Sequence, residues 1–143
     1  DSENHVLRVM DLTSGTIDLL AGEPGTYGDV DGPALESKLY YPTDLLFDDA
    51  TGQLFIADAN NHKVRVLDTA TGEMSTFAGT GEPSCALDRG LLVPVICDNQ
   101  HDGGDGGSAT DATLYRPFGI NFDADKNLYI SDTYNHRIRV VYR

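Results

Sequence analysis

Carboxylates in a glycine-rich loop are the first residues of this chain whose types and spacing could do chemistry. Asp102 and Asp105 are each followed by two glycines, and Asp98 lies a few positions earlier. Calcium prefers carboxylate and backbone carbonyl oxygens as ligands. This preference makes Asp98, Asp102 and Asp105 candidate metal ligands.

A second acidic stretch, residues 123–127, begins with the D-x-D-x-N spacing of an EF-hand loop. An EF-hand needs Gly at the sixth position and a bidentate Glu at the twelfth. Leu128 and Tyr134 stand at these two positions. The stretch therefore predicts a turn between two strands rather than a calcium loop.

Both cysteines, Cys85 and Cys97, lie in one insertion over residues 82–101, which also carries an apolar run. Two Cys are too few for a zinc site, and we expect a disulfide, which favours an extracellular or cell-surface location. An apolar loop needs a surface to cover it. The insertion either folds back on its own repeat or meets a partner, and the candidate interaction residues are Leu91, Leu92, Val95 and Ile96.

Three of the four histidines recur at one position of a repeat, which favours a fixed turn residue over a ligand. They are His5, His62 and His136, and His101 alone lies outside the repeat. The motifs G-x-S-x-G, H-E-x-x-H and G-x-x-x-x-G-K-[ST] are absent from the sequence. We therefore expect a protein that is not an enzyme.

The repeat reads D-x-x-N-H-x-Φ-R-V, where Φ is aliphatic, and occurs at residues 1–9, 58–66 and 132–140. Its flanking segments repeat in the same order. Short apolar runs bounded by turn residues indicate strands, and across the second hairpin Asp58 should pair with Lys63. One unit is predicted to hold four antiparallel strands, at Thr43–Phe47, Leu54–Ala57, Lys63–Leu67 and Met74–Ala78.

Four short strands repeated in tandem are typical of β-propeller blades, so the predicted fold class is all-β. Residues 42–79 form a complete blade, and residues 1–22 and 117–143 form partial blades. The first partial blade has two strands, the complete blade four and the last partial blade three. These nine strands are too few for a closed ring, which takes about 4–8 blades. We expect an incomplete propeller whose bare faces meet further blades of the same polypeptide or other chains packed head to tail, in a homo-assembly or filament.

The repeat resembles that of the NHL family, P-x-G-Φ…G-x-L-Y-Φ-A-D-x-x-N-H-R-I-R-V. Matching residues are Pro117–Ile120, Asn127–Asp132 and Asn135–Val140. Asp105–Pro117 is similar to the family's inter-blade loop, and Asp31–Pro42 is a looser copy. Because the resemblance makes this acidic loop an ordinary part of the family, we expect no metal or cofactor.

The NHL resemblance specifies the fold better than the function, because one fold hosts many functions. The function that we favour is a non-catalytic scaffold for protein–protein interaction or extracellular assembly. The alternative is a fragment of a secreted propeller enzyme, similar to the peptide-amidating lyases, whose active site lies on absent blades. The metal histidines of those lyases are not the repeat histidines, which leaves only His101 for that role.

The net charge narrows the class of partner. The chain carries 10 Lys and Arg against 23 Asp and Glu, a formal net charge of −13. Cationic residues dominate nucleic-acid affinity, and basic residues attract proteins to anionic membranes. No apolar run approaches the roughly 20 residues of a membrane-spanning helix. We therefore expect protein partners, with no nucleic acid and no membrane insertion.

Overall fold

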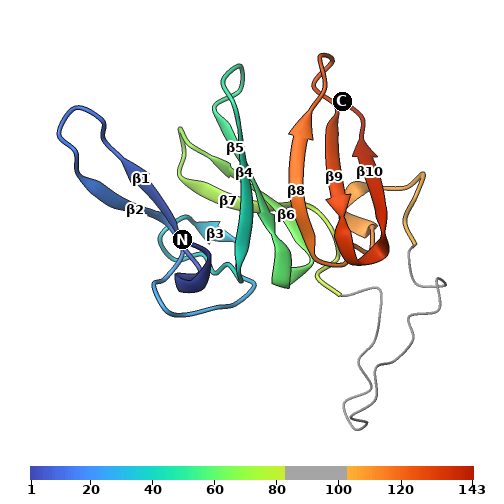
Figure 1. Ribbon diagram of the computed structural model, residues 1–143, viewed down its shortest axis with the longest axis horizontal. Coiled ribbons are helices and arrows are strands. Elements are labelled where there is room, and N and C mark those ends of the chain that lie inside the picture. The colour runs from blue at the N-terminus through green and yellow to red at the C-terminus, as the bar shows by residue number, and fades with distance from the viewer. Residues whose placement is uncertain (83–102) are drawn as a thin grey trace, which may run out of the picture.

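The computed structural model describes residues 1–82 and 103–143, which form three antiparallel sheets side by side (Figure 1). The first sheet is the hairpin of β1 (Leu7–Met10) and β2 (Ile17–Ala21). The second has the strand order β3-β7-β6-β5-β4, and the third has the order β10-β9-β8. Each sheet follows the previous one along the chain, as blades of a propeller do.

The strands of the second and third sheets are β3 (Gly32–Pro33), β4 (Pro42–Asp48), β5 (Gln53–Asp58), β6 (Lys63–Asp68), β7 (Glu73–Ala78), β8 (Pro117–Phe122), β9 (Leu128–Asp132) and β10 (Arg137–Val141). The described residues also form four short 3₁₀ helices: η1 (Ser2–Asn4), η2 (Ala59–Asn61), η3 (Ala109–Asp111) and η4 (Thr133–Asn135). No helix in the described part of the chain is long and apolar enough to cross a membrane.

Strand β5 shows why the sheets stack. Leu54, Phe55, Ile56 and Ala57 follow one another without polar alternation, and all four are buried. Successive side chains of a strand point to opposite faces, so a run of this kind needs cover on both sides. The hairpin β1–β2 provides it on one side, and the third sheet provides it on the other.

Two apolar clusters fill the spaces between the sheets. The first contains Leu7, Ala21, Ala34, Leu39, Leu54, Ile56, Leu67 and Met74. The second contains Phe55, Ala57, Val64, Val66, Ala78, Leu114, Ile120, Leu128 and Ile130. The core of the molecule is therefore a series of layers between neighbouring sheets.

Side chains of β4 also bond directly to the backbone of the neighbouring sheet. The Asp44 carboxylate accepts the N–H of Ile120 at 2.9 Å, and the Thr43 hydroxyl donates to the carbonyl oxygen of Phe118 at 3.0 Å. Asp44 occupies the position that Gly119 holds in the next repeat. The facing strands β4 and β8 are thus joined by polar contacts in addition to apolar packing.

The all-β prediction is confirmed, and the four strands predicted for the second sheet are present as β4, β5, β6 and β7. The prediction of nine strands was wrong by one, since residues 1–82 and 103–143 contain ten. The tenth is β3, in which Gly32 and Pro33 pair with Met74 and Glu73 on the outer edge of β7. A two-residue Gly-Pro strand has no sequence signal, because only its backbone makes the pairing.

Candidate interaction surface

The turn between the second and third strands of each unit has one fixed geometry. His5, His62 and His136 each follow a single 3₁₀ turn and adopt left-handed backbone angles, with φ of 60°, 56° and 54°. Nδ1 of His5 accepts the N–H of Tyr41 at 3.3 Å, and Nδ1 of His62 accepts the N–H of Arg116 at 3.1 Å. Each of these two imidazoles therefore binds the loop that leads into the next sheet.

These contacts hold two residues in an unusual conformation. Tyr41 and Arg116 have positive φ values of 60° and 49°, and each precedes a proline. Bulky residues rarely adopt positive φ, and a residue before proline prefers extended angles. Strain of this kind persists only where surrounding contacts fix it, and it often marks a functional position.

The first of two aromatic clusters lies beside Tyr41. Tyr27 stacks on Tyr40 with ring centroids 4.5 Å apart, and His5 packs edge-on against both rings. Tyr27 is 62% exposed. The rings therefore hold one another in place while one of them stays open to solvent.

The second cluster repeats this arrangement around Arg116. Tyr115, the equivalent of Tyr40, packs between His62 and Tyr134. Tyr134 contacts Phe118, and the Arg116 guanidinium lies 5.2 Å from the centre of the Tyr134 ring. Tyr134 is 46% exposed and Phe118 36%.

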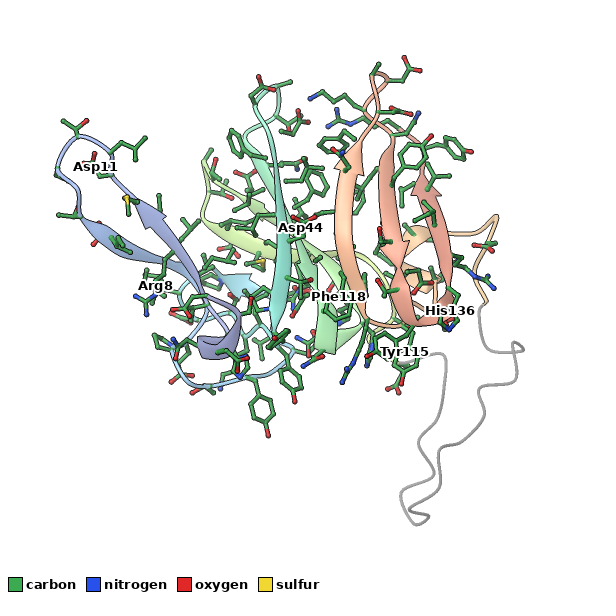
Figure 2. The ribbon with its side chains drawn as sticks, viewed as in Figure 1. Arg8, Asp11, Asp44, Tyr115, Phe118 and His136 are labelled. Atoms are coloured by element: carbon green, nitrogen blue, oxygen red, sulfur yellow. The ribbon has the colours of Figure 1, made fainter. Side chains whose placement is uncertain are left out.

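Both clusters lie at one end of the sheets, and we call them the tyrosine face: Tyr27, Tyr40, Tyr41, Tyr115, Arg116, Phe118 and Tyr134. Figure 2 shows Tyr115, Phe118 and His136 at this end, away from the hairpin turn that carries Asp11. Sequence reasoning missed these residues. The available signal was the recurrence of a tyrosine two positions before the repeat proline, at Tyr40 and Tyr115.

A buried charge centre anchors the loop beneath the first cluster. Arg65 and Asp58 are both fully buried and lie 3.1 Å apart. Arg65 also pairs with Asp31 and Asp29, and the Asp58 carboxylate accepts the N–H of Tyr40 at 2.7 Å. The expected pairing of Asp58 with Lys63 was wrong: the two face each other in the strand register, but Lys63 binds Asp29 at 2.6 Å.

The equivalent centre in the third sheet accounts for one metal candidate. Arg139 pairs with Asp105 at 2.5 Å and with Asp132 at 3.7 Å, and Asp132 accepts the N–H of Tyr115 at 2.7 Å. Arg137 lies 3.7 Å from Asp105. The structure therefore places Asp105 against guanidinium groups, and no cluster of three potential metal ligands is found among residues 1–82 and 103–143.

The pKa values of Asp58 and His62 depart from their ordinary range. Burial raises the pKa of Asp58 to about 6, against the opposing effect of the Tyr40 N–H, Asn61 and Arg65. Burial, with a smaller contribution from the Arg116 charge, lowers the pKa of His62 to about 4. His62 is therefore neutral at physiological pH, as its acceptor role at Nδ1 requires.

The other predicted site residues lie outside the part of the chain that the structure describes. They are Cys85, Leu91, Leu92, Val95, Ile96, Cys97, Asp98, His101 and Asp102. The disulfide, the apolar contact and the remaining metal ligands therefore stay predictions.

The order of the sheets and the repeated histidine turns agree with a family comparison. The family model described as the teneurin NHL domain matches residues 3–142. The chain belongs to the NHL-repeat family. NHL repeat-containing protein 2 of Bos taurus is 32% identical over 148 residues, a match that covers 99% of this chain and 18% of the relative. This chain thus spans about a fifth of that NHL relative.

Other relatives extend the comparison. The Arabidopsis thaliana protein SUPPRESSOR OF QUENCHING 1, chloroplastic, is 31% identical over 99% of this chain and 12% of its own length, and mouse Teneurin-1 is 33% identical over 64% of this chain and 3% of its own length. A Bacteroides thetaiotaomicron structure of unknown function covers 98% of this chain and 30% of its own, with a TM-score of 0.75 and 20% identity. That likeness supports the NHL-type propeller fold alone.

Proposed function

We propose that this NHL segment is a non-catalytic scaffold that binds other proteins through the tyrosine face. One observation carries the proposal: exposed aromatic rings and an arginine gather on loops at one end of the sheets. Tyr and Arg are enriched at protein interfaces and among the residues that dominate binding energy. A tyrosine ring carries a polar hydroxyl on an apolar body, which suits a surface that is solvated in the free protein and buried in a complex.

The fixed backbone around the face supports the same function. Tyr40 and Tyr115 are tied through their N–H groups to buried carboxylates, and Tyr41 and Arg116 are tied to histidines. Ordering loops and side chains lowers the affinity of an interface. Because hydrogen bonds already order these loops in the free protein, less binding free energy would be spent on ordering them when a partner binds.

Extracellular assembly is the finer part of the proposal. It rests on the expected Cys85–Cys97 disulfide, because disulfides persist in oxidising compartments. In that setting Leu91, Leu92, Val95 and Ile96 would meet a neighbouring chain, head to tail. Thiol labelling of the native protein without reductant tests this part: two reactive thiols would contradict an extracellular location.

The experiment for the tyrosine face is site-specific photocrosslinking in cells that express the protein. One variant carries a photoreactive phenylalanine at position 134, and the matched control carries it at position 12, where Leu12 is 88% exposed on the opposite turn. We expect a protein adduct from position 134 and none from position 12. The adduct is identified by mass spectrometry, and its protein component is purified for binding.

Binding of the purified partner must then require the side chains of the tyrosine face. Tyr27→Ser and Phe118→Ser should each weaken its binding to the chain about tenfold or more, as truncated interface anchors do, whereas Leu12→Ser should leave binding unchanged. Equal labelling from both positions, or binding that both Ser variants retain, would overturn the proposal.

A further inference from the structure

Arg116 differs from every other basic side chain in the described part of the chain. The other eight Lys and Arg side chains of residues 1–82 and 103–143 each lie 3.7 Å or less from a carboxylate oxygen. The Arg116 guanidinium forms no ion pair and no hydrogen bond within these residues, and lies over the ring of Tyr134 instead. Because the same residues contain 20 Asp and Glu against 9 Lys and Arg, an unpaired arginine is an exception that calls for a reason.

The corresponding place in the previous unit shows that a following sheet does not supply the missing partner. Tyr41 occupies the position of Arg116 there, and Asn60 occupies that of Tyr134. The third sheet is present beside this unit, yet among the described residues neither side chain forms a hydrogen bond or a ring contact with it. A sheet that follows the unit therefore leaves this part of the tyrosine face uncovered.

Arg116 is held at a fixed place on the tyrosine face. Its backbone has a φ of 49°, and its N–H donates to His62 Nδ1 at 3.1 Å. Its guanidinium lies 5.2 Å from the centre of the Tyr134 ring, and the Tyr134 N–H donates to the carbonyl of Tyr115 at 3.0 Å. A cation over an aromatic ring gains a favourable contact. Because the side chain is partly ordered before a ligand arrives, less affinity is lost to ordering it.

The guanidinium of Arg116 is suited to an oxyanion. Its N–H donors lie in one plane and match the two oxygens of a carboxylate, or two oxygens of a phosphate, in a bidentate pair. The contact with the Tyr134 ring does not use these donors as hydrogen bonds. They are therefore available to an anion from a partner.

The charge of the chain selects between these two anions. Residues 1–82 carry 15 Asp and Glu against 4 Lys and Arg, whereas residues 103–143 carry five of each kind. A phosphate monoester has a charge of about −1.5 to −2 at neutral pH, so an acidic chain repels it up to about twice as strongly as a carboxylate. The balanced third sheet is the part of the chain that opposes a single carboxylate least.

We propose that the tyrosine face recognises a protein segment with one Asp or Glu, whose carboxylate pairs with Arg116 beside an apolar or aromatic residue that packs on Tyr134. Tyr134 is 46% exposed and offers the apolar part of this contact. The first aromatic cluster takes no acid, because Tyr41 stands where the arginine would be. The inference rests on the proposed function and names the feature of the partner that the face selects.

The probe is a library of random short peptides displayed on phage and selected against the whole 143-residue chain. A parallel selection uses the variant Tyr134→Ser. Peptides that the parent chain retains and this variant loses are the ligands of the face. We expect Asp or Glu at one fixed position of these peptides, with an aromatic or aliphatic residue beside it.

Synthetic copies of one selected peptide, with both ends blocked, test the carboxylate. Replacement of the acid by its amide should raise Kd about tenfold, the effect of losing a hydrogen bond to a charged group. Arg116→Gln in the chain should raise Kd by the same factor, and this variant should bind the acid and the amide peptides equally. Arg8→Gln, which removes an arginine that is paired with Asp1, should leave Kd unchanged.

Equal binding of the acid and amide peptides to the parent chain would overturn the inference and leave the proposed function standing, a result that needs no protein variant. Unchanged affinity of the acid peptide for Arg116→Gln would also overturn it. Tighter binding of a phosphoserine copy, or of an amide copy with a free C-terminal carboxylate, would assign Arg116 to phosphate or to chain ends instead. A selection that yields no peptide dependent on Tyr134 would contradict the proposed function together with this inference.

Discussion

The two arginine centres of the chain have the same residues in the same order but different surroundings. Arg65 is fully buried, pairs with three carboxylates and lies under a sheet that β7 and β3 complete. Arg139 is 8% exposed and pairs with Asp105 and Asp132 beside a cavity of about 440 Å³.

The difference shows what a fourth strand contributes to a repeat of this type. It fills the apolar cavity through Met74, and it adds Thr76 as a donor to the carboxylate that already binds the arginine. The arginine and its aspartates do not need that strand to come together, since the third sheet assembles them without it.

Removal of the arginine should give the largest contrast between the two sheets. Arg65→Met leaves Asp58 buried and unpaired, and breaking a buried pair in this way costs about 3–5 kcal/mol. Arg139→Met should cost less, because Asp105 is 68% exposed and the buried Asp132 lies 3.7 Å from Arg139, farther than the 3.1 Å between Asp58 and Arg65. Urea unfolding of both variants measures the difference, with Arg8→Met at an exposed pair as the control. Equal losses would show that the fourth strand does not matter to the centre.

Met74→Ala should produce the next largest effect. The change leaves a cavity in the first apolar cluster, and large-to-small changes at buried positions lower the free energy of unfolding by about 2–5 kcal/mol. Val141→Ala removes part of the wall of the cavity beside Arg139 and should cost about 1 kcal/mol. Thermal unfolding distinguishes the two. A loss at Val141 as large as that at Met74 would argue that the cavity beside Arg139 is filled in solution.

The hydroxyl of Thr76 should have a smaller effect. Thr76→Val keeps the shape and the N–H but removes the hydrogen bond to Asp31, which contributes about 1 kcal/mol. Thr76→Ser keeps the hydroxyl and should lie closer to the parent in urea unfolding. If Val and Ser destabilise equally, the methyl group contributes as much as the hydrogen bond to Asp31, which contradicts the larger effect expected for the hydroxyl.

Acidification should have the smallest effect over a moderate pH range. The pKa of His62 is lowered to about 4 from its usual 6.5, so protons bind the unfolded chain more readily. The stability that neutral His62 contributes is complete above pH 6.5 and is lost as pH falls toward 4. From pH 7 to pH 6 the free energy of unfolding should fall by less than about 1 kcal/mol. The effect is reduced because the ring is partly exposed and solvent screens its charge.

His62→Asn isolates this contribution. Asn tolerates left-handed backbone angles and offers an acceptor oxygen to the Arg116 N–H, but it does not titrate. The variant should therefore lose less stability than the parent between pH 7 and pH 4, in paired urea titrations. An unchanged pH profile would mean that another group, such as one of the buried aspartates, dominates.

The strands of the second sheet could be predicted because their signals are local. Leu54–Ala57 is an apolar run between turn residues, and the D-x-x-N-H turn repeats at three places. The strand β3 could not, since Gly32 and Pro33 become a strand only through the backbone of β7. Register was also predictable, as Asp58 does face Lys63, but the choice of ion-pair partner was not.

The charge partners depend on loops that are distant in sequence. Arg65 reaches Asp29 and Asp31 from 34 to 36 residues away, and His62 reaches Arg116 from 54 residues away. Spacing in the sequence gives no information about such contacts. The recurring histidine was correctly taken as a turn residue, but the bonds of His5 and His62 to the loop before the next sheet could not be foreseen. The cysteine insertion and its apolar residues remain predictions, with Asp105 alone of the metal candidates now placed.

Asp44 sets a limit on how far this unit can be copied. Its carboxylate accepts the Ile120 N–H from the facing strand β4, at a position where the next repeat has Gly119. In a symmetric ring built only from copies of residues 42–79, every facing strand would carry the same carboxylate toward its neighbour. Like charges held close together in a confined space repel one another and resist joint ionisation. Variation between repeats at this position therefore keeps the polar link between sheets without a circle of negative charge.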